Sequence, residues 1–333
     1  MNKQEQLKYM VRVSCMTYNH VNYITDAMNG FTMQETNFPY VCTILDDAST
    51  DGEQEVIKKY LQEHFDLDNR SVVRNEETDD YVLAFAQHKT NRNCYFAVLF
   101  LKYNHYSIKK AKDQYIKEWL DVKYIAFCEG DDYWTDPQKI QKQVDFLKSH
   151  SDYVATAENA LVINSINKTE YLFSNEESRD LTVKELIIRR RFATASVVCR
   201  RDVYVKITDV TSILYDTMTW CFLCSQGKFR YNNIVSSVYR RGMQGITEYT
   251  DKYVWATIVE KWNTELRRLF CPKYIDNETI DKIIWNQYRI PFECGKRKTK
   301  LPSILKMYKY GSFLTTSKYL FRYLCRRITR FFF

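Results

Sequence analysis

Short apolar runs alternate with stretches of helical periodicity through the first half of the chain. The continuous apolar runs at 40–45 and 124–128 predict parallel strands buried on both faces, and the short β-prone run at 11–16 predicts a first strand. Apolar residues that recur every three to four positions predict helices that cover such a sheet. The predicted strands are residues 11–16, 40–45, 72–73, 124–128 and 154–163. Two helices are predicted over residues 23–33 and 108–120. A further helix has Val56, Ile57, Tyr60 and Leu61 as its apolar face, and another begins near Pro137. Residues 75–105 combine both patterns, and we assign no element to them.

This alternation predicts an α/β fold, in which right-handed crossovers place helices against a sheet. Ligands of such sheets bind beyond the carboxyl ends of the strands. The chain has no internal repeat and no obvious linker before about residue 245, and beyond that point it becomes helical, aromatic and basic. We therefore expect a first domain over residues 1–245 and a helical, basic C-terminal extension over residues 246–333.

The acidic loop, Glu129-Gly130-Asp131-Asp132, directly follows one of the apolar runs. Like charges this close repel one another, so their shared site favours a cation. Mg²⁺ and Mn²⁺ prefer oxygen ligands, and Mg²⁺ is usually bound by one or two carboxylates together with substrate phosphates. Gly130 also lets the backbone come close to a ligand. The loop therefore predicts a metal site; the alternative is an acidic turn in which Asp132 or Asp136 caps the next helix.

A second acidic segment, the aspartate loop at residues 46–52, follows another apolar run. A carboxylate of Asp46 or Asp47 can accept a hydrogen bond from the N3–H of a uracil or from a ribose hydroxyl. Tyr18, in the loop after the first predicted strand, can stack on a base, although it could equally be an ordinary loop tyrosine. The serine and threonine of the aspartate loop, followed by Glu53, are also typical of a helix-capping box, so capping and nucleotide binding can coexist here.

Taken together, these motifs resemble those of the family 2 glycosyltransferases, which have the GT-A fold. The similar stretches are VSCMTYN at 13–19, ILDDASTDG at 44–52, YIAFCEGDDYWTDP at 124–137, KIQKQVDFL at 139–147 and, more weakly, SSVYR at 236–240. The resemblance covers about residues 10–245 and is closest to enzymes of bacterial polysaccharide and lipid-linked glycan synthesis. It implies a Rossmann-like mixed sheet flanked by helices, with a nucleotide-sugar half at about 10–150 and an acceptor half at about 151–245.

The resemblance also implies a UDP-type sugar donor, a Mn²⁺ or Mg²⁺ ion, and inversion at the anomeric carbon. Carried over by position, Tyr18 and Asp47 would contact the base. Asp131 would lie near the ribose and the metal, and Asp132 would be the direct metal ligand. The position of the family's catalytic base corresponds to Asp216, ahead of a predicted helix, where the alternative role is a helix N-cap.

Two positions depart from the family pattern. The acidic motif of the family usually begins with Asp, whereas this chain has Glu129, whose longer side chain can still reach a metal. Many members carry a histidine soon after the tyrosine-arginine pair, near the diphosphate, whereas here Arg241, Gly242 and Met243 follow Arg240. Because arginine can neutralise phosphate instead, we assign Arg240 to donor binding.

The net charge of +8 is concentrated in the C-terminal extension, which has no acidic residue after Glu293. Two sets of residues there recur at helical spacing on different faces: Tyr319, Leu320, Tyr323, Leu324, Ile328 and Phe331, and the basic Lys318, Arg322, Arg326 and Arg330. A basic amphipathic helix with aromatic residues is typical of peripheral membrane contact. The alternative is a helix packed on the catalytic domain, with its cations in solvent and residues 331–333 buried in a partner.

Localisation follows from two further features. No apolar run is long enough to span a bilayer, and residues 1–9 are polar, without the pattern of a secretory signal. We therefore expect a cytoplasmic protein, peripheral at the inner face of the cell membrane, with no nucleic-acid partner.

The sequence thus predicts a metal-dependent, inverting glycosyltransferase of the hexosyl or N-acetylhexosaminyl type that uses a nucleotide sugar and a glycan or lipid-linked acceptor. A dehydrogenase would need a glycine-rich turn after the first strand, and residues 17–20 contain no glycine. A nucleotidyltransferase would show a basic, glycine-rich phosphate loop early in the chain, which is also missing. The alternative that stays open is a non-catalytic nucleotide-sugar-binding or partner protein that keeps the GT-A fold.

Overall fold

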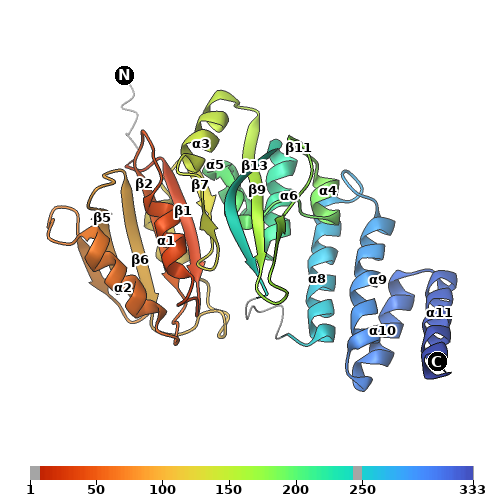
Figure 1. Cartoon of the computed structure of the whole chain (residues 1–333). Helices are drawn as coiled ribbons and strands as arrows, with labels where there is room; N and C mark the ends of the chain where they lie inside the picture. Colours follow the sequence, from red (N-terminus) through yellow and green to blue (C-terminus); the bar gives the residue numbers. More distant parts are fainter. Residues whose placement is uncertain (1–7, 243–249, 333) are drawn as a thin grey trace. The chain divides into compact units, whose positions relative to one another are not determined.

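The computed structural model describes residues 8–242 and 250–332 and divides the chain into two compact units (Figure 1). Of the described residues, the first unit contains 8–182, 189–212 and 219–242. The second unit contains 183–188, 213–218 and 250–332. Two short segments that precede residue 245 therefore belong with the C-terminal helices.

The first unit is built on a 13-stranded mixed sheet flanked by helices, which confirms the predicted α/β fold. The main path of the sheet is β11-β13-β9-β12-β7-β1-β2-β6-β5-β3, while β10 pairs with β9, β4 with β5 and β8 with β13. The strands are β1 (Val11–Thr17), β2 (Tyr40–Asp46), β3 (Phe65–Asp66), β4 (Arg74–Glu77), β5 (Tyr81–His88), β6 (Cys94–Leu101), β7 (Tyr124–Phe127), β8 (Tyr133–Trp134), β9 (Tyr153–Asn164), β10 (Thr169–Leu172), β11 (Arg179–Leu181), β12 (Val198–Arg200) and β13 (Lys228–Arg241).

The centre of the sheet is parallel, because β1 pairs in parallel with both β2 and β7, and β2 pairs in parallel with β6. In this register Thr17 lies opposite Asp46, and Ser14 lies opposite Phe127. The loops after β1, β2 and β7 consequently leave the sheet at the same edge. This register brings the acidic loop and the aspartate loop to one end of the sheet, on either side of the loop after β1.

Three helices of the first unit agree with the sequence: α1 (Ile24–Thr32), α2 (Glu53–His64) and α3 (Lys139–Ser149). The predicted apolar face of α1 is fully buried, and the Phe31 ring packs edge-on against Phe96 of β6 and Trp134 of β8. Burial of a side chain of this size contributes roughly 1.5–3 kcal/mol. Shorter helical segments complete the unit: η1 (Asp113–Leu120), η2 (Thr194–Ser196), α5 (Arg201–Tyr204) and η3 (Val205–Asp209).

Three local predictions need correction. Residues 72–73 form a turn and not a strand, and the strand begins at Arg74. The helix predicted over 108–120 is a 3₁₀ helix that starts only at Asp113, after a turn in which Lys109 has a positive φ of 56°. Residues 75–105, left unassigned, form most of β4 and all of β5 and β6. In β6 nearly every side chain is buried, so its continuous apolar run could not be told from a buried helix by periodicity.

The C-terminal part of the second unit is helical, as expected for the extension. Its helices are α8 (Lys252–Phe270), α9 (Asn277–Cys294), α10 (Arg297–Tyr310) and α11 (Phe313–Phe332); α4 (Val183–Ile188) also belongs to this unit, and α6 (Asp216–Gln226) begins in it. Glu260 of α8 accepts hydrogen bonds from Lys306, Tyr288 and Tyr310. Although burial acts to raise it, these partners lower the pKa of Glu260 to about 2. An ionised Glu260 therefore ties α8 to α9 and α10.

Helix α11 packs on α9 through part of its predicted apolar face. The Tyr319 ring lies edge-on to Trp285, and the Tyr323 ring lies against Phe292 at a centroid distance of 4.8 Å. Other apolar side chains of α11 stay exposed, as described below. Over the parts of the chain that the structure describes, none of the helices has the length and apolar character needed to cross a bilayer.

Candidate active site

The acidic loop leaves β7 and turns directly against the loop after β1. Gly130 donates its backbone N–H to the Met16 carbonyl at 3.0 Å. A Cβ atom at this position would lie 2.1 Å from Thr17 Oγ1 and 2.6 Å from Thr17 Cβ, far inside van der Waals contact. Only glycine allows this approach, and the approach holds the flanking carboxylates beside the end of β1.

Glu129, Asp131 and Asp132 form one carboxylate cluster. Each offers an oxygen, and these oxygens lie within 4.8 Å of one another. Asp132 is 1% exposed, whereas Asp131 is half-buried and Glu129 is exposed. Burial and the neighbouring Asp131 raise the pKa of Asp132 well above its ordinary range. Clustered hard oxygen donors with a surplus of negative charge fit a Mn²⁺ or Mg²⁺ ion.

Arg240, near the end of β13, fixes the acidic loop from the other side. Its backbone N–H donates to Asp132 Oδ1 at 2.8 Å, and its guanidinium donates to the Asp131 carbonyl at 2.9 Å. The same guanidinium pairs with Asp26 of α1 and lies over the rings of Tyr23 and Tyr133, at 5.0 and 4.5 Å from their centroids. These contacts position the loop, and any contact with donor phosphate would come in addition to them.

Asp46, the last residue of β2, is fully buried. Its Oδ1 accepts the Ser49 N–H at 3.2 Å and the Gln54 amide at 2.5 Å. Among the described residues its Oδ2 has no hydrogen-bond partner, and burial raises the pKa of this carboxyl. Asp46 therefore shapes the start of the aspartate loop from inside the protein.

Asp47 binds the segment that follows β6. Its Oδ1 accepts the His105 N–H at 2.8 Å, and its Oδ2 accepts the Tyr106 N–H at 3.1 Å and the Lys112 ammonium at 2.6 Å. Both carboxylate oxygens are thus used within the protein. These two backbone bonds divert residues 105–106 into a turn, which explains why the predicted helix starts late.

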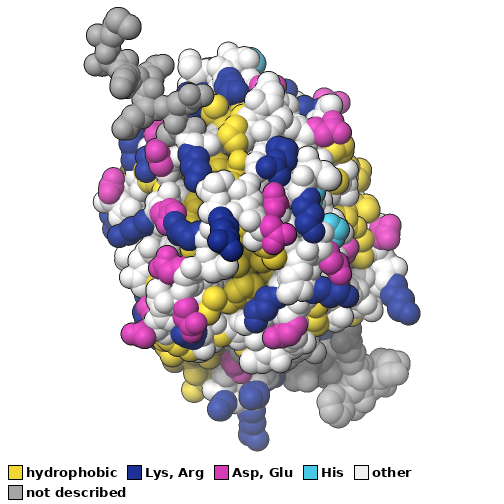
Figure 2. Space-filling view, turned by 90° about the vertical axis from the view of Figure 1, so that its left-hand side faces the viewer, with side chains coloured by type: hydrophobic (Ala, Val, Ile, Leu, Met, Phe, Trp, Pro, Cys, Tyr) yellow, Lys and Arg dark blue, Asp and Glu magenta, His cyan; other side chains and the backbone are white. Residues whose placement is uncertain are grey.

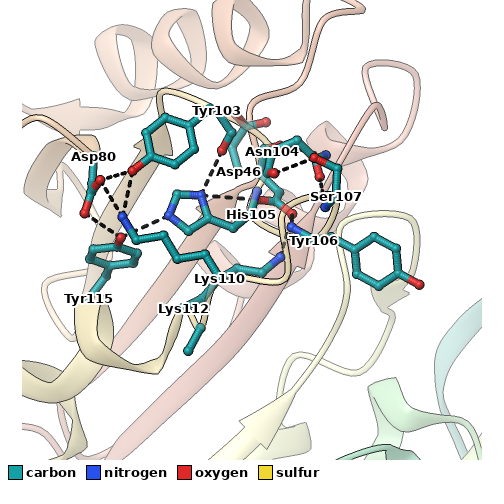
Figure 3. A network of polar contacts seen from close by, with 12 residues as sticks. Asp46, Asp80, Tyr103, Asn104, His105, Tyr106, Ser107, Lys110, Lys112 and Tyr115 are labelled. Carbon is teal, nitrogen blue, oxygen red and sulfur yellow. Dashed lines mark hydrogen bonds and ion pairs between the residues drawn. The ribbon is translucent and has the colours of Figure 1, made fainter.

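A polar network extends this connection to the turn before β5 (Figure 3). Asp80 accepts hydrogen bonds from Tyr103, from Tyr115 at 2.7 Å and from Lys110 at 2.7 Å. These donors lower the pKa of Asp80, Lys110 most strongly. His105 joins the network, because its Nε2 lies 3.0 Å from Tyr115 Oη. The segment 103–115 is therefore held at both ends, with Tyr106 60% exposed between them.

A cleft of about 590 Å³ opens at this edge of the sheet. Its lining residues come from the loop after β1, the aspartate loop, α2 and the β5–β6 end: Tyr18, Ala48, Ser49, Thr50, Gln54, Lys58, Val82, Phe100, Leu101, Lys102, Tyr103 and Asn104. Tyr18 is 43% exposed, so its ring is available to a ligand. Asp46 and Asp47 do not line the cleft but bind two residues that do. Asp46 accepts a hydrogen bond from the Gln54 amide, and the Asn104 amide donates to the Asp47 carbonyl at 3.2 Å.

Direct hydrogen bonds hold the aspartate loop against the loop after β1. The Asn19 N–H donates to Ser49 Oγ at 2.9 Å, and the Thr50 N–H donates to Asn19 Oδ1 at 2.8 Å. The predicted capping box is therefore wrong: the residue before α2 is Gly52, at a φ of 96°, and Asp51 Oδ1 instead accepts the first N–H of the helix, that of Glu53, at 3.0 Å. The Ser49 hydroxyl and the Thr50 N–H bind the neighbouring loop because the tertiary fold brings that loop within reach.

On the face of the first unit shown in Figure 2, basic and acidic side chains are interspersed, with apolar side chains visible between them. A nucleic-acid-binding surface would carry a continuous basic stripe. The face seen in Figure 2 has no such stripe.

Asp216, the position assigned to a catalytic base, is exposed and is the first residue of α6 in the second unit. The preceding residue, Tyr215, stacks on Trp262 of α8 at a centroid distance of 4.3 Å and an interplanar angle of 11°. This stack fixes the backbone that presents Asp216.

Sequence reasoning missed the residues that bind Asp47. No sequence pattern indicated a role for Lys112 or for the backbone of His105 and Tyr106. Their role depends on Asp47, which lies 58 to 65 positions away in the chain. His20 and Glu53 were also missed as site residues. Glu53, a charged residue with 0% exposure at the start of a helix, lies at the centre of the contacts between the two loops.

No protein-family model matches the chain. Curated relatives that it matches include the uncharacterized proteins Rv1520 of Mycobacterium tuberculosis and Mb1547 of Mycobacterium bovis, each 30% identical over 240 residues. The match covers 71% of this chain and 61% of each relative, so the chain spans about three-fifths of the length of these relatives.

Among solved structures, the chain is similar to residues 1–349 of S. aureus TarS. The TarS complex with UDP-GlcNAc has a TM-score of 0.57 at 13% identity, and TarS 1–349 alone has 0.53 at 12% identity. Both matches cover 90% of this chain and 80% of that chain. These neighbours are glycosyltransferases of GT-A-like fold. The chain has this fold.

Proposed function

We propose that this protein is a metal-dependent glycosyltransferase that transfers a sugar from a nucleotide sugar to a glycan or lipid-linked acceptor. The observation that carries the proposal is the carboxylate cluster of the acidic loop, held at the same edge of the sheet as a cleft of about 590 Å³. Thr17 touches Gly130, and the next residue, Tyr18, lines the cleft. A nucleotide bound in the cleft would thus lie next to the cluster.

The donor we propose is a UDP sugar. This choice agrees with the structure of TarS 1–349, to which the chain is similar and which contains UDP-GlcNAc. Tyr18 would stack on the base, while Asp46 and Asp47 position the cleft and its lining residues Gln54 and Asn104. Lys58 and Lys102 also line the cleft and would add positive charge near an anionic ligand. Arg240 would support the diphosphate chiefly by positioning the acidic loop.

Asp131 and Asp132 would hold the Mn²⁺ or Mg²⁺ ion, with Glu129 at the exposed side of the cluster. When bound, such an ion stabilises the charge that develops on a leaving diphosphate. Asp216 would accept the proton of the attacking acceptor hydroxyl, in a single displacement that inverts the anomeric carbon. The nucleotide-sugar half would lie at about 10–150, the acceptor half at about 151–245 and the extension at 246–333.

A panel of nucleotide sugars tests this proposal. The full chain is incubated with each donor and either Mn²⁺ or EDTA, and the released nucleoside diphosphate is measured. We expect one UDP sugar to give at least tenfold more UDP with Mn²⁺ than with EDTA, because a bound ion contributes several kcal/mol to leaving-group stabilisation. Metal-independent release would contradict the proposal. Tight UDP binding without any release would identify the non-catalytic alternative.

We also propose peripheral contact with an anionic membrane, but through a different face of α11 from the one predicted. Tyr319 and Tyr323 pack on α9 and cannot enter a lipid interface. Among the α11 side chains that the structure describes, the exposed large apolar ones are instead Phe313, Leu314, Phe321 and Leu324, at 77%, 62%, 68% and 57% exposure. Leu314, Lys318 and Phe321 follow one another at helical spacing, so this face combines apolar and basic residues.

The double variant Lys318→Gln/Arg322→Gln is expected to bind phosphatidylserine vesicles about 30-fold more weakly than the native chain, since each basic side chain contributes on the order of 1 kcal/mol near an anionic surface. Both side chains are exposed, so the fold should be retained. Co-sedimentation at low salt measures the effect. The matched control Lys58→Gln/Lys59→Gln on α2 should bind like the native chain. Equal binding of all three, or no binding of the native chain, would show that the face is not a membrane contact.

A further inference from the structure

His20 lies between the two acidic segments, in the loop after β1. Its backbone N–H donates to Glu53 Oε2 at 2.9 Å, and its Nδ1 lies 3.1 Å from Thr17 Oγ1. Its Nε2 faces the acidic loop, 4.0 Å from Asp131 Oδ2. The side chain of Asp131 is 26% exposed and that of His20 is 24% exposed, so solvent reaches both side chains.

The hydrogen bonds determine which nitrogen of His20 carries the proton. Three donors meet at Glu53: the His20 N–H, the Ser49 hydroxyl at 2.8 Å and the Thr17 hydroxyl. When Glu53 is ionised it accepts from all three, and the Thr17 hydroxyl then gives its only proton to this carboxylate. The Thr17 oxygen can then only accept from His20, so Nδ1 carries the hydrogen. In neutral His20 the lone pair is consequently on Nε2, which faces Asp131.

We propose that His20 is a further metal ligand through Nε2, and that it biases the site towards Mn²⁺ over Mg²⁺. This inference rests on the proposed metal site. His20 lies outside the 4.8 Å group of the three carboxylates, and its one close neighbour there is Asp131. Ligand atoms about 2.1 Å from one octahedral ion lie roughly 3 to 4 Å apart, so the separation of 4.0 Å between Nε2 and Asp131 Oδ2 permits an ion shared by these two side chains. An imidazole nitrogen suits the softer transition metals better than it suits Mg²⁺, which prefers oxygen.

Thr17 and Glu53 are the positioning residues of this ligand. A metal-binding histidine commonly donates its other ring nitrogen to a neighbouring acceptor, which fixes the tautomer and the ring orientation. Here the acceptor is Thr17 Oγ1, itself oriented by the buried Glu53 at the start of α2. Glu53, at the start of α2, therefore influences the metal ion through Thr17 and His20. Asp46 and Asp47 make no direct contact with the ion.

The test uses Mn²⁺ itself as the probe, bound to the full chain in the presence of UDP. Electron spin echo envelope modulation of the bound ion reports a directly coordinated imidazole as ¹⁴N coupling. We expect this coupling in the native chain and in His150→Gln, and its loss in His20→Gln. His150 follows α3, whose 11 residues span about 16 Å, so it lies well away from the acidic loop. Labelling the histidines of the native chain with ¹⁵N should replace the ¹⁴N coupling by a ¹⁵N coupling. This result would exclude a uracil nitrogen as the source of the coupling.

Affinities give a second readout. His20→Gln should weaken Mn²⁺ binding about tenfold or more and change Mg²⁺ binding much less. The ratio of the Mn²⁺ affinity to the Mg²⁺ affinity should therefore fall. Thr17→Val should weaken Mn²⁺ binding about tenfold, and Thr17→Ser, which keeps the hydroxyl, should restore it.

Two outcomes would overturn the inference in different ways. Asp132-dependent Mn²⁺ binding without ¹⁴N coupling would leave the metal site standing and show that His20 only pairs with Asp131 or a phosphate. A native chain that does not bind Mn²⁺ with or without UDP would overturn the metal-dependent function and the histidine ligand together.

Discussion

Asp132→Asn is expected to lower sugar transfer by roughly 10³-fold or more, because a neutral amide cannot replace a carboxylate ligand of the ion that stabilises the leaving diphosphate. The fold should survive, because an asparagine oxygen can still accept the Arg240 N–H that Asp132 Oδ1 accepts now. Burial and Asp131 raise the pKa of Asp132, so ionising this side chain at neutral pH costs stability in the metal-free protein. Removal of the charge should therefore leave the melting temperature in EDTA unchanged or higher.

The decisive measurement is thermal unfolding with UDP, with and without Mn²⁺. An ion at about 100 times its dissociation constant adds about 2.7 kcal/mol to the native chain, which is several degrees at this size. Asp132→Asn should lose both this shift and the activity. The exposed Asp145→Asn on α3 is the matched control and should keep both. Wild-type turnover in purified Asp132→Asn at saturating donor would refute the metal role of Asp132.

Asp216→Asn is expected to lower transfer by about 10²–10⁴-fold while leaving UDP binding unchanged, because it removes a proton acceptor and no phosphate contact. Asparagine is a good residue near a helix start, so α6 should still begin at this position. The Tyr215–Trp262 stack that fixes the preceding backbone is untouched.

Single-turnover transfer and UDP titration separate the two effects. The control is Asp209→Asn, an exposed aspartate at the end of η3, which should behave like the native chain in both assays. Weaker UDP binding with normal transfer in Asp216→Asn would mean that this residue serves the donor. Normal behaviour in both assays would mean that Asp216 is only part of the helix start.

The predictions that held are those with a local cause. The strand β2 is an apolar run buried on both faces, and β1 is a short run rich in β-branched and apolar residues that is buried mainly on one face. Each is followed by a loop rich in polar residues. The apolar face of α1 follows from spacing alone, because every buried position recurs with the helical period. The carboxylate cluster was predictable because its three members lie within four residues.

The predictions that failed were decided by distant partners. The helix expected from residue 108 begins late because Asp47, 58 and 59 positions earlier, binds the backbone of His105 and Tyr106. A side chain that accepts backbone N–H groups offers the chain an alternative to helix formation. The serine of the aspartate loop does not cap α2, because Asn19 and Glu53 use its hydroxyl.

Helix α11 shows the same division within one element. Its sequence predicts a helix with an apolar and a basic side, and the helix is present. Periodicity alone could not say which apolar residues pack and which stay in solvent. Contacts with Phe292 and Trp285 of α9 partly bury Tyr319 and Tyr323 and leave Phe321 exposed, so the surface available to a membrane differs from the predicted one.

By itself the sequence determined the strands β1, β2, β7 and β9, the helices α1, α2 and α3, the position of the acidic loop after a buried strand, and the helical, basic character of the C-terminal extension. These properties depend on residues that are close together in the chain. The spacing of their apolar and charged side chains can be read from the sequence alone. Only the tertiary structure decided that Thr17 lies against Gly130, that Arg240 fixes the acidic loop and that His20 faces Asp131. Those contacts join residues about 110 positions apart. The contacts of Thr17 and His20 follow from the parallel register of β1 and β7, and that of Arg240 from the antiparallel pairing of β13 with β8, neither of which a local pattern specifies.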